Sequence, residues 1–334
     1  MPHVIALGEA LIDFVSLEKG VTLEQSPGFE KAAGGAPANV AAGVAIMGTS
    51  AGFVGKVGDD FCGRFIKEVL FDAGVDLTNF VLDPGHHTQL AFVTVLADGS
   101  PDFTFYVPEA ADTQLGIGDL NAEYIASADI FHFGSISLIN EPIRLATFRA
   151  IEIAADAGCL ISYDPNLRPP LWPDLETARR EITAAIELCD VMKLSENELQ
   201  FITGESDLAT GAAQILAKGP ELVAVTVGAE GCYYMNGQTQ GMLKGFTVPV
   251  EETTGCGDAF VAGMLVKLFE LMKDGREPGD LEDEELIPAL SFANAAGALT
   301  ATGKGAIPSL PPRDEVEEFL RDRLPEYFGE EDPD

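Results

Sequence analysis

The chain is organised around the stretch Glu251-Glu252-Thr253-Thr254-Gly255-Cys256-Gly257-Asp258-Ala259-Phe260. Residues 246–250 before it alternate apolar and small side chains as a short strand would, and the apolar residues after it recur with helical spacing. The stretch is therefore predicted to join a strand to a helix. Its glycines allow a ligand to approach the backbone closely, and the free N–H groups at the start of a helix favour an anion.

Asp258 distinguishes this loop from an ordinary phosphate-binding turn. A carboxylate at the anion-binding end of a helix would repel a phosphate, so its presence there is better explained by a role as a base. The alternative is a purely structural one, in which Asp258 caps a glycine-rich turn.

Residues 253–260 read TTGCGDAF, which closely resembles the C-terminal signature of the ribokinase-like, or PfkB, sugar kinases, usually DTTGAGDAF. The resemblance implies that the loop amides at residues 255–257 stabilise the transferring phosphoryl group and that Asp258 takes the proton of the accepting hydroxyl. Cys256 replaces a small residue, which is a mild change because the backbone amide, and not the side chain, would contact the phosphoryl group. Glu252 replaces an Asp that the family associates with a monovalent cation, so a K⁺ site at Glu252 is a weaker expectation.

The N-terminal part carries further likenesses to the family. Residues 4–14 form an apolar run typical of a strand that is buried on both faces, with Asp13 near its end. Asp13 ends the pattern GEALID, and in the sugar kinases an Asp at this place holds sugar hydroxyls, although an Asp near a strand end is commonly a turn residue. Gly34 and Gly35 precede a helix of small residues that contains Asn39. The resemblance implies that these glycines and Asn39 contact the sugar, while tight packing of a small-residue helix is compatible with the same pattern.

The pentapeptide DPNLR, residues 164–168, resembles a motif of fructokinases and 2-keto-3-deoxygluconate kinases. The resemblance implies that Arg168 contacts the substrate. The alternative is a simple turn after a strand, for which Asp-Pro-Asn is a favourable sequence. A site for the keto-deoxy acid should offer an Arg fork to its carboxylate. Relatives that use this acid often have Arg shortly after the Tyr that corresponds to Tyr106, whereas this chain has Val107 and then Glu109. A neutral hexose, with fructose first, is therefore the expected substrate.

From about residue 128 onward, short apolar runs alternate with helical patterns. The predicted strands are 130–133, 160–163, 191–194 and 222–227. Strands spaced by helices indicate an α/β fold with a doubly wound, mostly parallel sheet, in which ligands bind at the carboxyl ends of the strands. We expect residues 1–334 to form a single kinase domain.

A different pattern precedes this alternation. Residues 88–96 and 103–107 are predicted to form a hairpin through residues 97–102, which indicates a separate small sheet. The family resemblance implies that segments 14–33 and 79–107 form a lid over the sugar, that Tyr106 contacts the substrate, and that the lid could serve as a homodimer contact.

The resemblance also predicts a site for ATP and Mg²⁺. Ser195 and Glu198 form a predicted capping box at a helix start, and Glu198 matches the family's NxxE element, which acts on Mg²⁺ and its waters. The segment 226–231 resembles the family's TxGxxG element near the ATP phosphates. The residues expected to bind the nucleotide are Lys193, Thr226, Gly228, Gly231 and Asn294.

Composition excludes several other classes. The formal net charge of −34 disfavours nucleic acid and anionic membranes as partners. No N-terminal signal pattern and no apolar run of about eighteen residues is present, and the five cysteines form no CxxC pair. We therefore expect a soluble, cytoplasmic protein. The isolated pair His86 and His87 indicates loop residues rather than a metal site.

Two nucleotide-binding alternatives lack their motifs. Residues 303–305, GKG, lack the upstream glycine and following Ser or Thr of a Walker A loop, and residues 8–11 do not match GxGxxG. The remaining alternatives are a 2-keto-3-deoxygluconate kinase, another PfkB-type sugar or nucleoside kinase, and a sugar- or nucleotide-binding regulator that has the fold without catalysis.

Overall fold

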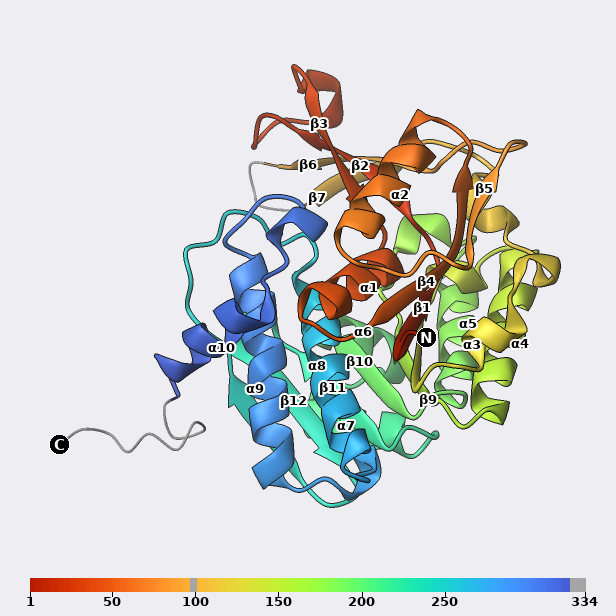
Figure 1. The fold of residues 1–334 in the computed structure, drawn as a ribbon. Helices are drawn as coiled ribbons and strands as arrows, with labels where there is room; N and C mark the ends of the chain where they lie inside the picture. The colour runs from red at the N-terminus through yellow and green to blue at the C-terminus, as the bar shows by residue number, and fades with distance from the viewer. Residues whose placement is uncertain (97–100, 325–334) are drawn as a thin grey trace.

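The computed structural model describes residues 1–96 and 101–324. Its main feature is a nine-stranded sheet with the strand order β13-β12-β11-β10-β9-β8-β1-β4-β5 (Figure 1). The strands of this sheet are β1 (Val4–Leu7), β4 (Ala51–Gly58), β5 (Phe80–Asp83), β8 (Ile130–Gly134), β9 (Leu160–Asp164), β10 (Val191–Ser195), β11 (Leu222–Thr226), β12 (Gly231–Asn236) and β13 (Gln240–Lys244).

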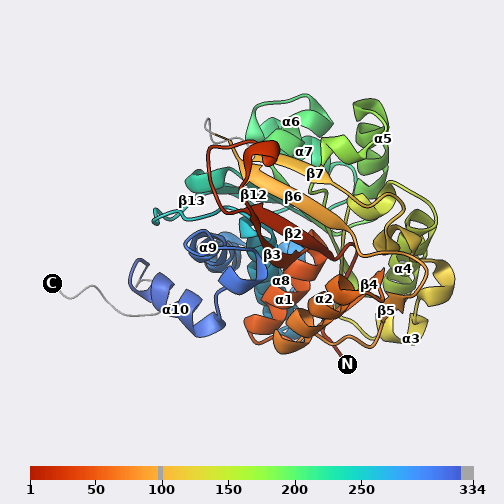
Figure 2. The ribbon, with the colours of Figure 1, turned by 90° about the horizontal axis from the view of Figure 1, so that it is seen from above.

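Helices cover both faces of this sheet. The helices are α1 (Ala36–Ile46), α2 (Phe61–Asp72), α3 (Ala122–Ile125), α4 (Ile143–Asp156), α5 (Leu175–Ile186), α6 (Glu196–Thr203), α7 (Leu208–Leu216), α8 (Cys256–Lys273), α9 (Asp283–Thr300) and α10 (Arg313–Arg321). One buried cluster joins the sheet to α4, α5 and α7, and another joins it to α1, α8 and α9 (Figure 2). This arrangement confirms the doubly wound α/β fold.

In the large sheet, the connections between strands determine which neighbours are parallel and which are antiparallel. The strands from β5 to β11 in the sheet order are parallel, because helical crossovers join them, whereas β12 and β13 are antiparallel hairpin strands at one edge. The four strands predicted from residue 128 onward correspond to β8, β9, β10 and β11. Their carboxyl ends therefore lie at one edge of the sheet.

A second sheet of four strands lies above that edge (Figure 1). Its order is β3-β2-β6-β7, and the strands are β2 (Leu11–Ser16), β3 (Phe29–Gly34), β6 (Leu90–Val95) and β7 (Pro101–Phe105). β6 and β7 are antiparallel, as predicted, but their connection at 97–100 lies outside the described residues. The range 79–107 also contains β5, which pairs with β4 in the large sheet. The roles of the small sheet as a lid and dimer contact stay predictions.

Two local predictions were wrong. The apolar run 4–14 was expected to form one strand with Asp13 near its end, but it divides into β1 and β2, which belong to different sheets, so Asp13 lies within β2. The chain turns at Gly8, where a Cβ would lie 2.6 Å from Cγ of Pro37. Residues 246–250 were expected to form a strand but are irregular after β13 ends at Lys244, and four of them line a cavity. Pro249 in this segment has no N–H to donate to a neighbouring strand.

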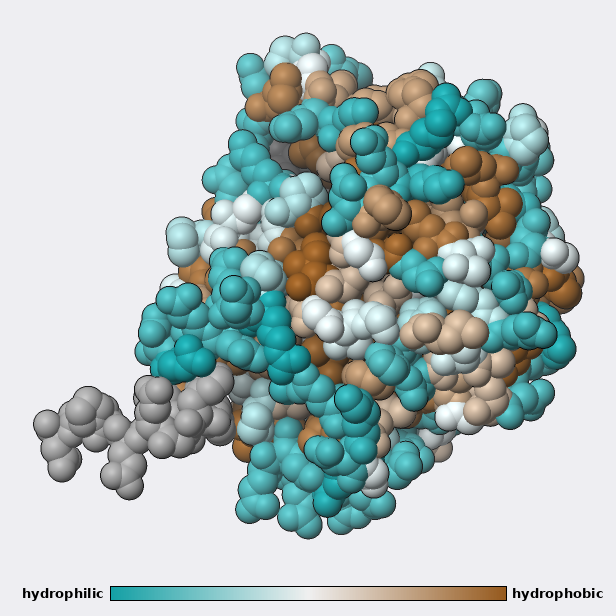
Figure 3. All heavy atoms as spheres, viewed as in Figure 1, coloured by the Kyte–Doolittle hydropathy of each residue, from teal (hydrophilic) through white to brown (hydrophobic). Residues whose placement is uncertain are grey.

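One face of the molecule combines hydrophilic and hydrophobic areas. In Figure 3, hydrophobic patches lie over the region of α1 and α2, between hydrophilic residues. In residues 1–96 and 101–324, no helix combines the length and the apolar character needed to cross a bilayer.

Candidate active site

Asp258 lies in the first turn of α8, after the glycine-rich loop. Gly255 caps this helix with a φ of +81°, and a Cβ there would lie 2.8 Å from Cβ of Ala306, so both the backbone conformation and the space require glycine. Asp258 is 8% exposed, and its Oδ2 accepts a hydrogen bond of 2.8 Å from Nδ2 of Asn39 on α1. The helix start and α1 thus fix the carboxylate from two sides.

The environment of Asp258 suits a base. Burial raises its pKa to about 6, a rise that the hydrogen bond from Asn39 opposes and the nearby Asp164 carboxylate adds to. A carboxyl with such a pKa is ionised at neutral pH and still basic enough to accept a proton.

We expect kcat/KM to fall as the pH drops below about 6, because a protonated Asp258 cannot accept a proton. Asn39→Ala removes the hydrogen bond that lowers the pKa of Asp258, so the acid limb of the profile should move to higher pH. Profiles of kcat/KM between pH 5 and 9 for the wild-type enzyme and Asn39→Ala measure this shift. We expect a shift of roughly one pKa unit, which is the contribution of one strong hydrogen bond to a charged group. An acid limb at the same pH in both proteins would contradict it.

The loop before Asp258 supplies backbone donors. The N–H of Cys256 donates to the carbonyl of Thr253 at 3.3 Å, so one of the three amides predicted to bind the phosphoryl group is engaged within the turn. The amides of Gly257 and Asp258 lie in the first turn of the helix, where an α-helix has no carbonyl to offer them. These two amides are the better donors for an anion.

The residues expected to bind the sugar meet around β2, β3 and the start of α1. A Cβ on Gly34 would collide with the Asp13 carboxylate, and one on Gly35, whose φ is +107°, would collide with the carbonyl of Glu9. Burial raises the pKa of Asp13 to about 7, with Glu252 adding to the rise and Arg168 opposing it.

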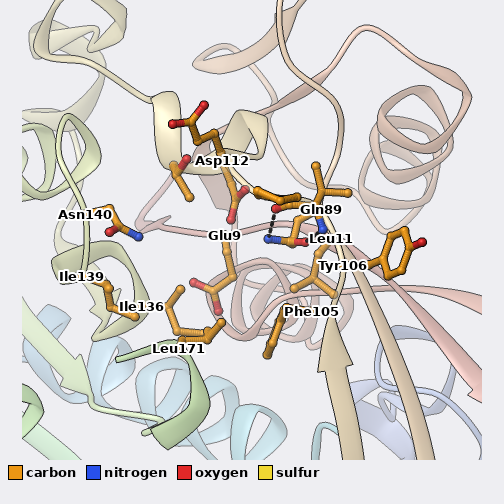
Figure 4. Close-up of a pocket in the computed structure, with 14 residues that line it drawn as sticks. Glu9, Leu11, Gln89, Phe105, Tyr106, Asp112, Ile136, Ile139, Asn140 and Leu171 are labelled. Carbon is orange, nitrogen blue, oxygen red and sulfur yellow. Dashed lines mark hydrogen bonds between the residues drawn. The ribbon is translucent and has the colours of Figure 1, made fainter. Parts of the chain in front are cut away.

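Arg168 and Tyr106 are the other two residues expected to contact the sugar. Nη1 of Arg168 donates to the carbonyl of its neighbour Leu167 at 3.2 Å, which leaves other donors of the guanidinium for a ligand. Tyr106 is 68% exposed, packs edge-on against Phe92, and points away from Glu9 in Figure 4.

A cavity of about 320 Å³ adjoins the glycine-rich loop. It lies between the turn after β11, residues 245–250 and helices α8 and α9, and Cys256 and Gly257 are part of its wall. Four of the five predicted nucleotide contacts line it: Thr226, Gly228, Gly231 and Asn294.

Lys193, the fifth, lies beneath the loop. It is 6% exposed and forms an ion pair of 3.0 Å with Asp164, and a Cβ on Gly257 would lie 3.2 Å from its Nζ. Burial acts to lower the pKa of Lys193, but Asp164 and Glu198 raise it above its ordinary value, so the side chain is charged at neutral pH. Its charge lies below the backbone donors of Gly257.

Glu198 performs the structural role predicted for it. It closes the capping box with Ser195, whose N–H and Oγ lie 2.7 and 2.9 Å from its Oε2, while its Oε1 accepts from the N–H of Leu167. Glu252 likewise accepts a hydrogen bond of 3.0 Å from the N–H of Gly305. Their roles toward Mg²⁺ and a monovalent cation stay predictions.

Sequence reasoning missed three buried carboxyls near this site: Glu9, Asp112 and Asp164. Glu9 follows β1 and Asp164 ends β9, so an acid at the end of a buried strand was a usable signal for both. Asp112 lies in a short 3₁₀ turn, and no periodicity or motif indicated its burial.

A family model described as "pfkB family carbohydrate kinase" matches residues 1–313. The chain belongs to this family. Fructokinase-1 from Zea mays is 47% identical over 319 residues, which are 95% of this chain and 97% of that protein. The sugar-kinase family predicted from the glycine-rich loop is therefore confirmed.

Solved structures agree with the assignment of this chain to the pfkB family. The fructokinase from Xylella fastidiosa with bound ATP has a TM-score of 0.87 and 33% identity, covering 97% of this chain and 99% of that one. A double mutant of the fructokinase from Vibrio cholerae, with bound fructose, ADP and potassium ion, has a TM-score of 0.84 and 34% identity, covering 96% and 98%. This pfkB protein is a sugar kinase.

Proposed function

We propose that this kinase transfers the γ-phosphoryl group of ATP to the primary hydroxyl of D-fructose, giving fructose 6-phosphate. The observation that carries the proposal is the buried Asp258 carboxylate, held by Asn39 beside the loop that lines the cavity of about 320 Å³. The fructokinases of Zea mays, Xylella fastidiosa and Vibrio cholerae support the choice of sugar.

In this mechanism Asp258 takes the proton of the hydroxyl while the hydroxyl oxygen forms a bond to the γ-phosphorus. The bond from that phosphorus to the β-γ bridging oxygen breaks, and ADP leaves. The amides around Gly257 and the charge of Lys193 beneath them would stabilise the phosphoryl group during transfer, which depends on positioning and electrostatics more than on covalent help.

The residues fit a magnesium ion that is held mainly by the nucleotide. Within the described ranges, no group of three or more His, Cys, Asp or Glu side chains is placed to hold a metal ion. Mg²⁺ usually keeps several waters and binds substrate phosphates with one or two carboxylates, and when bound it neutralises phosphate charge. Glu198, whose oxygens are fixed by protein donors, would orient a water of such an ion.

Release of ADP tests the function directly. We expect ADP release to depend on sugar, and kcat/KM to be at least tenfold higher for D-fructose than for 2-keto-3-deoxygluconate, because Val107 and Glu109 offer no cation to the carboxylate. A tenfold ratio corresponds to about 1.4 kcal/mol in transition-state binding. A preference for the keto-deoxy acid would contradict the choice of sugar, and sugar binding without ADP release would favour the regulator.

Glu252 should tune a monovalent-cation effect. Its carboxylate already accepts from the N–H of Gly305 and has lone pairs left for a cation beside the loop. We expect turnover to be several-fold faster in K⁺ than in a bulky organic cation at matched ionic strength, and Glu252→Gln to reduce that ratio. Equal rates of the wild-type enzyme in K⁺, Na⁺ and the organic cation would show that no cation acts there.

A further inference from the structure

Residues 246–250, here called the wall segment, form part of the wall of the nucleotide cavity. The residues of the segment that line the cavity are Phe246, Thr247, Val248 and Val250. The phosphates of a nucleotide favour the backbone donors of the glycine-rich loop, because an apolar surface would remove their hydration without replacing it. The wall segment, whose lining side chains are mostly apolar, therefore suits the base of ATP.

The backbone of the wall segment does not fix its position. The N–H of Gly245 donates to the carbonyl of Glu230, and the N–H of Glu251 donates to the carbonyl of Ala301, both at 2.8 Å. Between these two points, residues 246–250 make no backbone hydrogen bond in the part of the chain that the structure describes. Because no hydrogen-bonded ladder holds it, the wall segment depends on the packing of its side chains.

The ring of Phe319 on α10 packs against the ring of Phe246. The two ring centroids are 5.2 Å apart and the ring planes lie at 79°, which is the edge-to-face arrangement that aromatic pairs favour. Phe319 is 9% exposed. Arg323 lies over its ring, with Cζ 3.7 Å from the centroid, and donates from Nη1 to its carbonyl at 3.2 Å. Phe319 is therefore well placed to hold Phe246.

Helix α10 is itself anchored to the rest of the molecule. It packs against α9 (Figure 2). Arg313 at its start forms ion pairs with Glu270 of α8 and, at 2.6 Å, with Glu317. Val316 and Leu320 are buried in the cluster that also contains residues of α8 and α9. Because α8 and α9 form another part of the cavity wall, α10 connects them to the wall segment.

We propose that Phe319 is a positioning residue for nucleotide binding, which holds the wall segment in place for the base of ATP. In the described chain Phe319 does not line the cavity, so it acts through Phe246. The family model matches residues 1–313, so α10 lies almost entirely beyond the part of the chain that the model describes. The proposal rests on the proposed function, since it takes ATP to occupy this cavity.

Two substitutions at Phe319 test the role of its ring. Phe319→Leu keeps an apolar side chain but removes the edge-to-face pair, so we expect the Kd of ATP, measured by calorimetry without sugar, to rise about fivefold. KM for ATP should rise by the same factor, while kcat and KM for D-fructose stay within about twofold, because the contact is remote from the reacting groups. Phe319→Tyr keeps the ring and should bind ATP like the wild type.

A double-mutant cycle shows whether Phe319 acts through Phe246. Phe246→Leu should itself weaken ATP binding, because Phe246 lines the cavity. In the Phe246→Leu background, Phe319→Leu should then change the Kd of ATP by less than about twofold, since the pair is already lost. The same factor in both backgrounds would overturn the proposal.

Ile182→Ala is the control for a general loss of stability. Ile182 on α5 is fully buried in the cluster at the other face of the sheet, so its replacement should lower the melting temperature and leave the Kd of ATP unchanged. All comparisons are made at a temperature where melting curves show folded protein. The proposal is overturned if Phe319→Leu binds ATP as tightly as the wild type, or if Ile182→Ala weakens ATP binding as much.

Competition with ATP identifies the part of the nucleotide that is affected. In Phe319→Leu the Kd of ADP should rise by the same factor as that of ATP, whereas the Kd of inorganic tripolyphosphate should not change; an equal rise for all three would contradict a role at the base. If another sugar proves to be the substrate and Phe319→Leu weakens ATP binding, the choice of fructose fails and the inference stands. If fructose is phosphorylated and Phe319→Leu binds ATP like the wild type, the inference alone fails.

Discussion

Asp258→Asn should lower kcat by roughly 10²–10⁴, the range expected for loss of a general base. The substitution preserves the shape of the side chain, and the amide oxygen of Asn can still accept the hydrogen bond that Nδ2 of Asn39 gives to Oδ2. Local structure should therefore be kept while basicity is lost. Steady-state kinetics with saturating ATP and fructose measure the effect.

Two controls separate this loss from a structural one. ATP binding should stay within a fewfold of the wild type, because Thr226, Gly228 and Asn294 line the nucleotide cavity whereas Asp258 does not. Asp274→Asn, at the other end of α8, should leave kcat unchanged. A variant at position 258 that kept near wild-type turnover would remove Asp258 from the mechanism.

The sequence was most informative where local chemistry is specific. The glycine-rich loop, the capping box at Ser195 and the strands β8 to β11 depend on nearby residues, so their patterns predicted them directly. The pattern failed at Gly8, because an apolar run looks alike whether it continues in one sheet or passes to another. Pro37 of α1, which leaves no room for a Cβ at Gly8, comes from a distant part of the sequence.

The site was predictable in part for the same reason. Motifs located Asp258, Asn39 and the loop that lines the nucleotide cavity, because each lies in a recognisable segment. Asp112 lies in a 3₁₀ turn that lines the same cavity as Glu9, which is far away in the sequence, and no local pattern records such an arrangement.

Lys193→Met should have the largest effect on stability. Lys193 and Asp164 form an ion pair of 3.0 Å, and their side chains are 8% and 5% exposed. Removing the cation leaves a buried carboxylate without its counter-charge, which costs about 3–5 kcal/mol for such pairs. Because Asp164 and Glu198 raise the pKa of Lys193 above its unfolded value, this stabilisation is fully present at neutral pH and is lost only as the pH rises through the raised pKa.

A double-mutant cycle distinguishes the pair from simple loss of packing. Asp164→Asn keeps the acceptor that Oδ1 provides to the N–H of Asn166, so the double variant with Lys193→Met should recover most of the stability lost in Lys193→Met alone. Urea denaturation at pH 7 and at pH 9 gives the free energies of unfolding. If the double variant were as unstable as the sum of the two single variants, the ion pair would not be the source of the loss. Lys193→Met and the double variant should also bind ATP more weakly, since both lack the positive charge beneath Gly257.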